Sequence, residues 1–196
     1  EFKIADDGEV LTRGRHVFIG YLNNEASTRD TVDAEGWLHT GDLAEITPKG
    51  LVRIRGRKKE IMKTSGGKMI APVPIEEQIK NSNLISQVCM VGDGRKYFSA
   101  LITLSEELLK NLQNKPGAFS DSVVKDAETI ANVKRHLDVV NKNLASYEKI
   151  KYFTLLSRDF SIEEGELTPT MKMKRGVIES RFCDVINTMY QSASDD

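Results

Sequence analysis

The sequence has little of what metal sites, disulfide frameworks and membrane spans require. It contains two cysteines and three histidines in 196 residues. Cys89 stands in the apolar run QVCMV and Cys183 in a helical pattern, so we expect buried, reduced thiols and no bridge or metal site. The histidines, His16, His39 and His136, show no ligand spacing. No run approaches the roughly 18 apolar residues that cross a bilayer, and no secretory signal is visible.

The chain also lacks a large net charge of either sign, since its 28 Lys and Arg residues are balanced by 29 Asp and Glu residues. A general polyanion binder normally carries a clear basic excess, so any cationic function must be local and we expect no nucleic-acid partner. Hydrophobic residues make up 39% of the chain and can supply a core. The length suits one domain, or a domain plus part of another. Because EFKI at the start already reads as a strand, we interpret the chain as cut from a longer one.

The first 55 residues carry the apolar–polar alternation that is typical of β-strands. An Asp-Gly turn divides FKIADDGEVL into two such arms, which is a hairpin signal. Further strands are predicted at HVFIGYL (16–22) and GLVRI (50–54). In LVRIR the alternation places Leu51, Arg53 and Arg55 on one face, and Gly56 then interrupts the pattern.

From about residue 60 the pattern mixes helices and strands. EIMKT and KMIAP are predicted to pair across Ser65-Gly66-Gly67, and a helix to begin at Pro74 with two glutamates in its first turn. ISQVCMVGD, YFSALITL and IKYFTLL read as strands. An apolar stripe predicts helical structure over residues 105–146. A last helix is predicted to close the chain, and Ser192 to Asp196 are expected to fray. The fold class is therefore α+β, with a β-rich part, a short joint and a second domain.

The segment GWLHTGDL (36–43) presents Asp42 on a predicted turn. The ordinary alternative is a loop in which this carboxylate caps its own backbone. The functional hypothesis is a carboxylate held rigidly enough to accept both hydroxyls of a ribose, as acidic residues do in dinucleotide sites.

The segment GRKKEIMKTSGGK (56–68) crowds cations beside glycines at the joint. Arg57 is able to contact phosphate in a bidentate manner, while Lys59, Lys63 and Lys68 supply point charges. Backbone N–H groups around Gly66-Gly67 are predicted to form an anion-binding nest. A solvated cationic loop is the alternative. The segment is not a Walker loop, because the required spacing of glycines and lysine is absent.

The segment GELTPTMKMKRGVI (165–178) is a third cluster. Thr168-Pro169-Thr170 predicts a stiff, extended approach to Lys172, Lys174 and Arg175. Extended alternation would place both lysines on one side with the methionines opposite. A basic loop that leads into a helix is the alternative.

The three segments in this order resemble the AMP-forming acyl-CoA synthetases of the adenylate-forming superfamily. That superfamily also includes aryl-CoA ligases, peptide-synthetase adenylation domains and firefly luciferase. LTPTMKMKR is similar to the long-chain fatty acyl-CoA branch, and KMIAPVPIEE with RDFSIEEGELTPTMK to its bubblegum-like members. The resemblance implies that residues 1–55 are the β-rich terminal part of the N-terminal adenylation domain. Residues 56–59 would then be a hinge, and 60–196 a mobile C-terminal lid domain with a short sheet flanked by helices.

The resemblance also implies roles for individual residues. Asp42 would hold the ribose hydroxyls of ATP and of the acyl-adenylate, with Arg57 beside the same ribose and phosphate. Lys59 falls on the hinge position. Lys172 matches the catalytic lysine that reaches the α-phosphate, although Thr-Met-Lys here replaces the more usual Ser-Gly-Lys and leaves Lys174 as the alternative register. The face expected to turn toward CoA carries Lys63, Gly66, Gly67 and Lys68.

The reaction that the resemblance implies is ATP-dependent ligation of a long-chain fatty acid to CoA, with AMP and pyrophosphate as products. Mg²⁺ would be bound mainly by the N-terminal domain that this chain lacks, so we expect the chain alone to be inactive. A non-catalytic module that binds an anion or a partner, and a ligase for another carboxylic acid, are the alternatives. The expected location is the cytoplasm, and peripheral membrane contact stays open.

Overall fold

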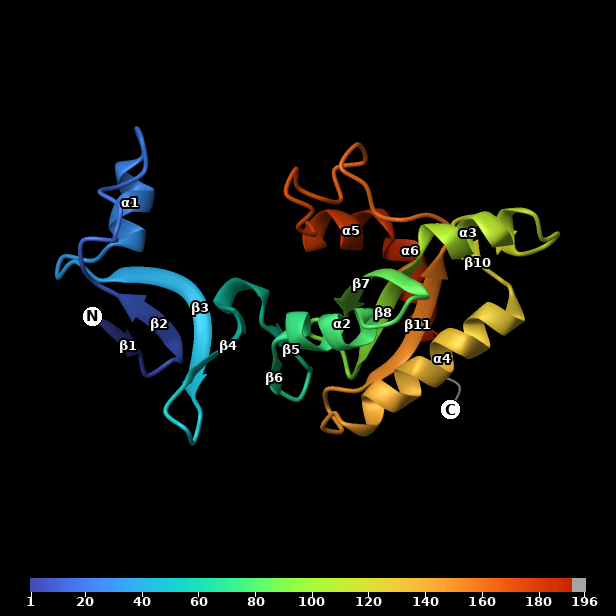
Figure 1. Cartoon of the computed structure of the whole chain (residues 1–196), viewed down its shortest axis with the longest axis horizontal. Coiled ribbons are helices and arrows are strands. Elements are labelled where there is room, and N and C mark those ends of the chain that lie inside the picture. The colour runs from blue at the N-terminus through green and yellow to red at the C-terminus, as the bar shows by residue number, and fades with distance from the viewer. Residues whose placement is uncertain (192–196) are drawn as a thin grey trace. The chain divides into compact units, whose positions relative to one another are not determined.

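The computed structural model describes residues 1–191, in which helices and strands mix along the chain (Figure 1). The predicted α+β class is confirmed. The chain divides into two compact units, Glu1–Ile61 and Met62–Asp196. Within the described residues, no helix is both long and apolar enough to cross a membrane.

The first unit is built on an antiparallel sheet of four strands in the order β1-β2-β3-β4. The predicted hairpin around the Asp-Gly turn forms, and Gly8 supplies the positive φ of 86° that this turn needs. Leu11, Trp37 and Ala44 make a small buried core. The elements of this unit are β1 (Phe2–Ile4), β2 (Glu9–Thr12), α1 (Glu25–Thr31), β3 (Leu38–Ile46), β4 (Val52–Arg57) and the 3₁₀ helix η1 (Lys58–Glu60).

The strand predicted at residues 16–22 is wrong, because this segment forms turns and irregular chain. Gly20 adopts a φ of 152°, a conformation that a strand of L-residues does not use. Most of its apolar residues, which suggested a buried strand, are instead exposed, and Ile19 and Leu22 are almost fully so.

The predicted interruption of the strand at Gly56 is also wrong. Strand β4 runs through Gly56 to Arg57, and its register against β3 shifts between Leu43 and Ala44. Leu43 lies opposite Gly56 and Ala44 opposite Ile54, so Arg55 is the extra residue of a β-bulge. The bulge allows the strand to continue and sets Arg57 directly opposite Asp42.

The second unit contains a five-stranded sheet in the order β7-β8-β11-β10-β9, in which only the β8–β11 pair is parallel. Alternate residues of its central strands enter two separate cores. Val88 and Met90 face one core, and Cys89 and Val91 face the other. The strands are β7 (Ile85–Val91), β8 (Phe98–Leu104), β9 (Phe119–Ser120), β10 (Val123–Val124) and β11 (Ile150–Leu156).

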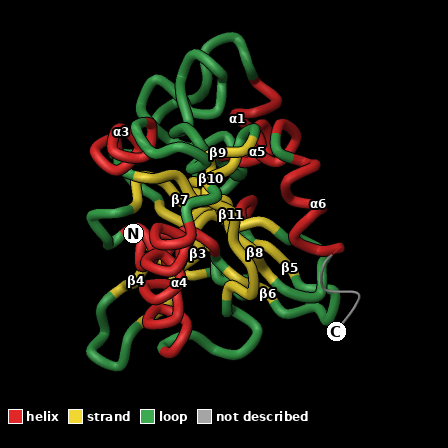
Figure 2. The backbone as a smooth tube through the Cα atoms, turned by 90° about the vertical axis from the view of Figure 1, so that its right-hand side faces the viewer, coloured by secondary structure: helices red, strands yellow, loops and turns green. Residues whose placement is uncertain are grey.

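Helices cover both faces of this sheet, which explains why its central strands are continuous apolar runs. The helices α2 (Pro72–Lys80) and α4 (Ala127–Lys142) pack into the first core, whereas α5 (Arg175–Arg181) and α6 (Cys183–Gln191) pack into the second. Figure 2 shows strands of the sheet between α4 and α6. The three strands predicted in this half, ISQVCMV, YFSALITL and IKYFTLL, are thereby confirmed.

The helical predictions in this unit need three corrections. Helix α2 begins at Pro72, so Pro74 lies inside its first turn and the two glutamates fall one turn later than expected. Residues 105–146 hold two helices, α3 (Glu106–Gln113) and α4, separated by the short β9–β10 hairpin. The closing helix is divided at Phe182 into α5 and α6. The expected fraying at Ser192 to Asp196 lies outside the described residues.

The two cysteines differ from each other, contrary to expectation. Cys89 is fully buried as predicted, and burial raises the pKa of its thiol to about 12, so it is an inert core residue. Cys183 is exposed at the first position of α6. The helical pattern did not reveal that this residue lies on the outer face of the helix.

Asp126 is the N-cap of α4, and its carboxylate accepts hydrogen bonds from the Thr129 backbone and hydroxyl while pairing with Lys115. The bond from Lys115, followed by those from Thr129, lowers the pKa of Asp126 from 3.8 to about 2. A lowered folded-state pKa stabilises the fold above pH 3.8, and this contribution is lost as pH falls toward 2.

We therefore expect Asp126→Asn to be less stable than the wild type at pH 7, with a gap that closes between pH 4 and pH 2. Asparagine also caps helices well, so the change removes mainly the charge. Urea denaturation across this pH range measures the gap. A gap that stays constant with pH would contradict the assignment.

Candidate adenylate-binding and lid residues

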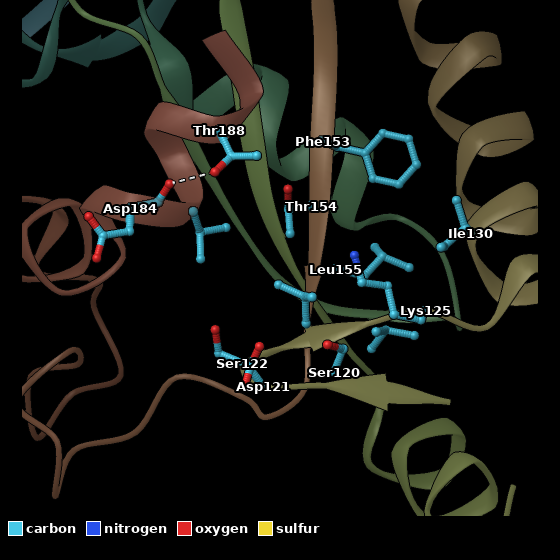
Figure 3. Close-up of a pocket in the computed structure, with 13 residues that line it drawn as sticks. Ser120, Asp121, Ser122, Lys125, Ile130, Phe153, Thr154, Leu155, Asp184 and Thr188 are labelled. Atoms are coloured by element: carbon cyan, nitrogen blue, oxygen red, sulfur yellow. Dashed lines mark hydrogen bonds between the residues drawn. The ribbon is translucent and has the colours of Figure 1, made fainter. Parts of the chain in front are cut away.

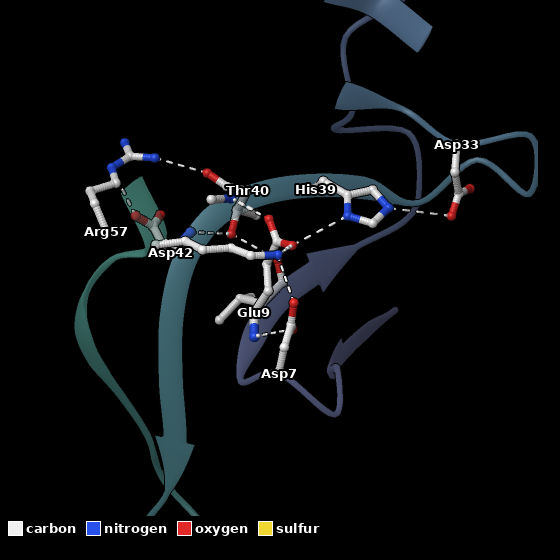
Figure 4. Close-up of polar contacts among 10 residues, drawn as sticks. Asp7, Glu9, Asp33, His39, Thr40, Asp42 and Arg57 are labelled. Atoms are coloured by element: carbon white, nitrogen blue, oxygen red, sulfur yellow. Dashed lines mark hydrogen bonds and ion pairs between the residues drawn. The ribbon is translucent and has the colours of Figure 1, made fainter. Parts of the chain in front are cut away.

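Asp42 and Arg57 lie side by side on neighbouring strands of the first unit (Figure 4). Arg57 Nε is 3.0 Å from Asp42 Oδ1, and Arg57 Nη1 donates to the Thr40 carbonyl at 2.8 Å. The Asp42 side chain is one-third exposed and the Arg57 side chain half exposed. The sequence prediction that these two residues serve one site is thus compatible with their positions, which present a carboxylate and a guanidinium together at the sheet surface.

Asp42 lies within β3, so the turn predicted for it is wrong. The buried carboxylate of Glu9 supports the part of this strand that carries Asp42. Glu9 accepts the Gly41 N–H at 2.8 Å and pairs with Lys58 Nζ at 3.0 Å and with His39 Nδ1 at 3.4 Å (Figure 4). Burial raises the pKa of Glu9, but the bonds from Lys58, Gly41 and His39 outweigh it and hold the pKa below its usual range. Sequence reasoning did not identify Glu9 or Lys58.

Several cations of residues 53–68 are already paired within the first unit. Arg53 and Arg55 both contact Glu45, on the adjacent strand. Lys58 bridges Asp7 and Glu9, and these two carboxylates raise its pKa, with Asp7 contributing more. Part of the positive charge in this segment therefore forms ion pairs within the first unit. Fewer of these residues are available to bind an anion than the sequence suggested.

Lys59 lies in η1, and its side chain is exposed. It makes no ion pair with any residue that the structure describes, unlike its neighbour Lys58. The hinge role expected for Lys59 stays a prediction.

The predicted pairing across Ser65-Gly66-Gly67 is confirmed. Met62–Lys63 (β5) pairs with Met69–Ile70 (β6), and Gly67 takes the positive φ of 78° that the turn requires. The hairpin is fixed to the turn before β8, since Lys63 N–H donates to Asp93 at 2.7 Å and Ser65 N–H to the Arg95 carbonyl at 2.9 Å. Four of the predicted site residues are exposed on this hairpin: Lys63, Gly66, Gly67 and Lys68.

The expected anion nest at this turn is not formed, because most of its amides donate within the protein. Gly67 N–H donates to the Thr64 carbonyl and Lys68 N–H to the Thr64 hydroxyl. Together with the bond from Ser65, these contacts leave only the Gly66 N–H of residues 65–68 for a ligand. The lysine side chains remain as the cationic groups of this face.

Lys172 lies on a tight loop, and the predicted extended alternation of this segment is wrong. Leu167 and Met173 form an antiparallel bridge, and Thr168 N–H donates to the Lys172 carbonyl at 2.8 Å. Met171 completes the reversal with a φ of 61°, which is unusual for a residue with a side chain. Lys174 instead stands at the N-cap of α5.

This geometry separates the two candidate lysines. Lys172 is exposed on the turn, and its ammonium has no hydrogen bond or ion pair to a described residue. Lys174 is held at the base of the loop, where its N–H donates to the Glu166 carbonyl at 2.7 Å. Both lysine side chains are exposed, but Lys172 stands on the turn of the loop and Lys174 at its base.

The predicted residues do not form one site within either unit. Asp42 and Arg57 belong to the first unit, whereas the β5–β6 hairpin and the Lys172 loop are separate segments of the second (Figure 1). Among the described residues, no group of three or more Cys, His, Asp or Glu side chains is arranged to hold a metal ion.

A pocket of about 430 Å³ opens in the second unit between β10, β11, α4 and α6 (Figure 3). Its walls include Ile130, Phe153, Leu155 and Asp184. None of the residues that the sequence analysis selected lines this pocket, so it is distinct from the candidate site.

The family model that describes the C-terminal domain of AMP-binding enzymes matches residues 59–194. This chain belongs to that family. The sheet of the second unit and the exposed loop of Lys172 both lie within the matched residues.

Two curated relatives of this AMP-binding family extend the match to nearly the whole chain. The long-chain-fatty-acid–CoA ligase FadD15 of Mycobacterium tuberculosis is 40% identical over 96% of this chain and 32% of its own length. The long-chain-fatty-acid–CoA ligase ACSBG2 of Xenopus laevis is 38% identical over 95% of this chain and 28% of its own length. The chain thus spans about a third of the curated relatives that it matches.

Solved adenylation domains share the fold. The adenylation domain of a carboxylate reductase from Mycobacterium chelonae superposes with a TM-score of 0.82 at 24% identity, covering 97% of this chain and 31% of that one. The corresponding domain from Segniliparus rugosus, solved with AMP and a co-purified carboxylic acid, gives a TM-score of 0.77 at 23% identity, covering 95% of this chain and 28% of that one. These similarities establish the architecture only.

Proposed function

We propose that this chain is the C-terminal part of an ATP-dependent long-chain fatty acid–CoA ligase. The observation that carries the proposal is the identity of about 40% to a protein named as such a ligase, over almost the entire chain. The reaction would form an acyl-adenylate and pyrophosphate from fatty acid and ATP. The thiol of CoA would then attack the acyl carbon and release AMP.

The first unit would hold the nucleotide. The Asp42 carboxylate is the hydrogen-bond acceptor for the ribose hydroxyls, and Arg57 keeps that carboxylate in place through its contacts with Asp42 and Thr40. Glu9 fixes the Gly41 backbone next to Asp42, so this part of β3 is held in place before the ligand arrives. Such preorganisation lowers the cost of orienting a substrate.

The second unit would supply a different cation in each step. In adenylation one anion attacks another, so a lysine at the α-phosphate stabilises the charge that develops there. Lys172 would serve this step, and the β5–β6 hairpin with Lys63, Gly66, Gly67 and Lys68 would face CoA in the second. Rotation about residues 56–59, with Lys59 as the hinge residue, would exchange the two faces.

The domain boundaries follow from this proposal. Residues 1–55 would end the large N-terminal domain, and 60–196 would form the lid. The phosphate loop, most Mg²⁺ contacts and the acid-binding tunnel would lie in the polypeptide before this chain. We therefore expect the chain alone to form no acyl-CoA.

The test is acyl-CoA synthesis by the full-length polypeptide with ATP, Mg²⁺, CoA and carboxylic acids from acetate to very long chains. Turnover that is confined to long chains, with AMP as the second product, supports the proposal. Turnover with other acids alone would reassign the substrate. Release of ADP, or no turnover on any acid, would contradict the ligase and favour a non-catalytic module that binds anions or a partner.

A further inference from the structure

The loop that carries Lys172 returns to the protein core through a buried ion pair. Arg175 follows Lys172 by three residues and begins α5. Its Nη2 lies 2.8 Å and 3.0 Å from the two carboxylate oxygens of Glu76, a residue of α2. The Glu76 side chain is 5% exposed and that of Arg175 19%. Two elements from opposite faces of the sheet are thereby joined at the end of the loop.

The same pair is fixed to the central sheet. Arg175 Nη1 donates to the Met90 carbonyl at 2.6 Å, and Glu76 accepts the Met90 N–H at 2.7 Å. Burial lowers the pKa of Arg175, but the Glu76 carboxylate outweighs it and the pKa lies above its usual value. The guanidinium therefore stays charged, and its position is set by strand β7 on one side and by α2 on the other.

The other end of the loop is held in a similar manner. Glu166 is fully buried, and Arg158 donates to both of its carboxylate oxygens at 2.7 and 2.8 Å. The Glu166 carbonyl also accepts the Lys174 N–H at 2.7 Å, which closes the loop at its base. Both ends of the Lys172 loop are thus fixed, while the turn between them projects into solvent.

Stability alone does not explain why charged pairs occupy these positions. A buried ion pair is often no more stabilising than apolar residues of the same volume, because both charges lose their hydration. What such a pair supplies is a defined geometry, since a carboxylate and a guanidinium match only in certain orientations. A lysine that must reach one phosphate oxygen benefits from a support of that kind.

We propose that Glu76 and Arg175 are positioning residues that hold the Lys172 loop for adenylation. This inference rests on the proposed function. It adds two residues that would act through the position of Lys172 rather than by contact with the fatty acid or ATP. Their removal shifts the loop while leaving the Lys172 side chain chemically intact.

The test compares Glu76→Gln and Arg175→Lys in the full-length enzyme. Glutamine still accepts the Met90 N–H but loses the charge that faces Arg175. Lysine keeps the charge but cannot reach Glu76 and Met90 with two separate nitrogens. We expect the kcat of adenylation, measured by pyrophosphate exchange, to fall about tenfold to a hundredfold, with little change in the KM for ATP. Thioester formation from supplied acyl-adenylate should not change.

A double-mutant cycle with Lys172→Ala separates positioning from general damage. If Glu76 acts through Lys172, Glu76→Gln lowers adenylation in the wild type but not in the Lys172→Ala background. Asp126→Asn is the matched control, because it also turns a buried carboxylate of this unit into an amide without touching the loop. It should lower the melting temperature and leave the ratio of the two half-reactions unchanged.

The outcomes distinguish the two proposals. Equal loss of both half-reactions in Glu76→Gln and Arg175→Lys, or the same loss with and without Lys172, would overturn the positioning role alone. Adenylation that survives in Lys172→Ala would overturn the role of Lys172, and the positioning role with it. Should one variant fail to fold, as judged by circular dichroism, the other completes the cycle.

Discussion

Replacing Lys172 by alanine in the full-length enzyme is expected to lower adenylation by about 10²- to 10³-fold, the scale on which one preorganised electrostatic contact acts. The exposed turn places this ammonium away from the rest of its unit, and no described residue neutralises it. Pyrophosphate exchange with a long-chain acid measures adenylation. Thioester formation from supplied acyl-adenylate should stay within about threefold of the wild type, because the lysine would be needed only while charge develops at the α-phosphate.

Lys174→Ala is the matched control for this experiment, since it removes the same charge two residues away. Its side chain stands at the N-cap of α5, at the base of the loop rather than on its turn. We expect only a small loss of adenylation in this variant. A larger loss with Lys174→Ala than with Lys172→Ala would mean that the register of the motif was assigned wrongly.

The sequence predicted most of the regular elements of the fold, because their signals are local. The strands of the second unit are apolar runs bounded by turn residues, and the β5–β6 hairpin has glycines where its turn needs them. The segment at 16–22 failed because exposed apolar residues gave the same local signal as a buried strand. A local pattern of apolar residues does not show whether another part of the protein packs against the segment and buries it.

The sequence also selected Asp42, Arg57 and Lys172 as members of three charged segments, but their individual roles came from the resemblance to a family. Glu9 and the Glu76–Arg175 pair escaped notice because their roles depend on contacts between distant parts of the chain. Arg175 meets Glu76 across 99 residues of sequence. A glutamate in a helix ordinarily faces solvent, and nothing near Glu76 indicates that it turns inward to meet Met90.

The reversal of the chain at Met171 was equally hidden. Threonine, proline and methionine all favour extended or helical backbone, and a methionine with positive φ is not expected from its residue type. The turn forms because the Leu167–Met173 bridge and the ion pairs Arg158–Glu166 and Glu76–Arg175 at its ends determine the path of the chain. Such conformations are typically maintained by surrounding structure at functional sites.

Replacing Gly66 by leucine is expected to have the opposite effect to Lys172→Ala, namely a loss of thioester formation of about tenfold to a hundredfold with adenylation retained. The choice of glycine matters. Gly67 has a φ of 78°, so any side chain there strains the turn, whereas Gly66 has no positive φ and a Cβ would lie 3.8 Å from the Thr64 hydroxyl, an ordinary contact. Gly66→Leu therefore adds bulk to the face without deforming the hairpin.

Asn83→Leu, at another exposed turn of the same unit, controls for a new apolar surface residue and should leave both half-reactions unchanged. Each half-reaction is measured separately, with pyrophosphate exchange for the first and supplied acyl-adenylate plus CoA for the second. If Gly66→Leu loses thioester formation and Lys172→Ala loses adenylation, the two segments act in different steps. A rotating lid explains such a result, whereas one site with a fixed arrangement does not. If Gly66→Leu lowers adenylation as much as thioester formation, the hairpin does not serve CoA alone, and the alternation of two faces loses its main support.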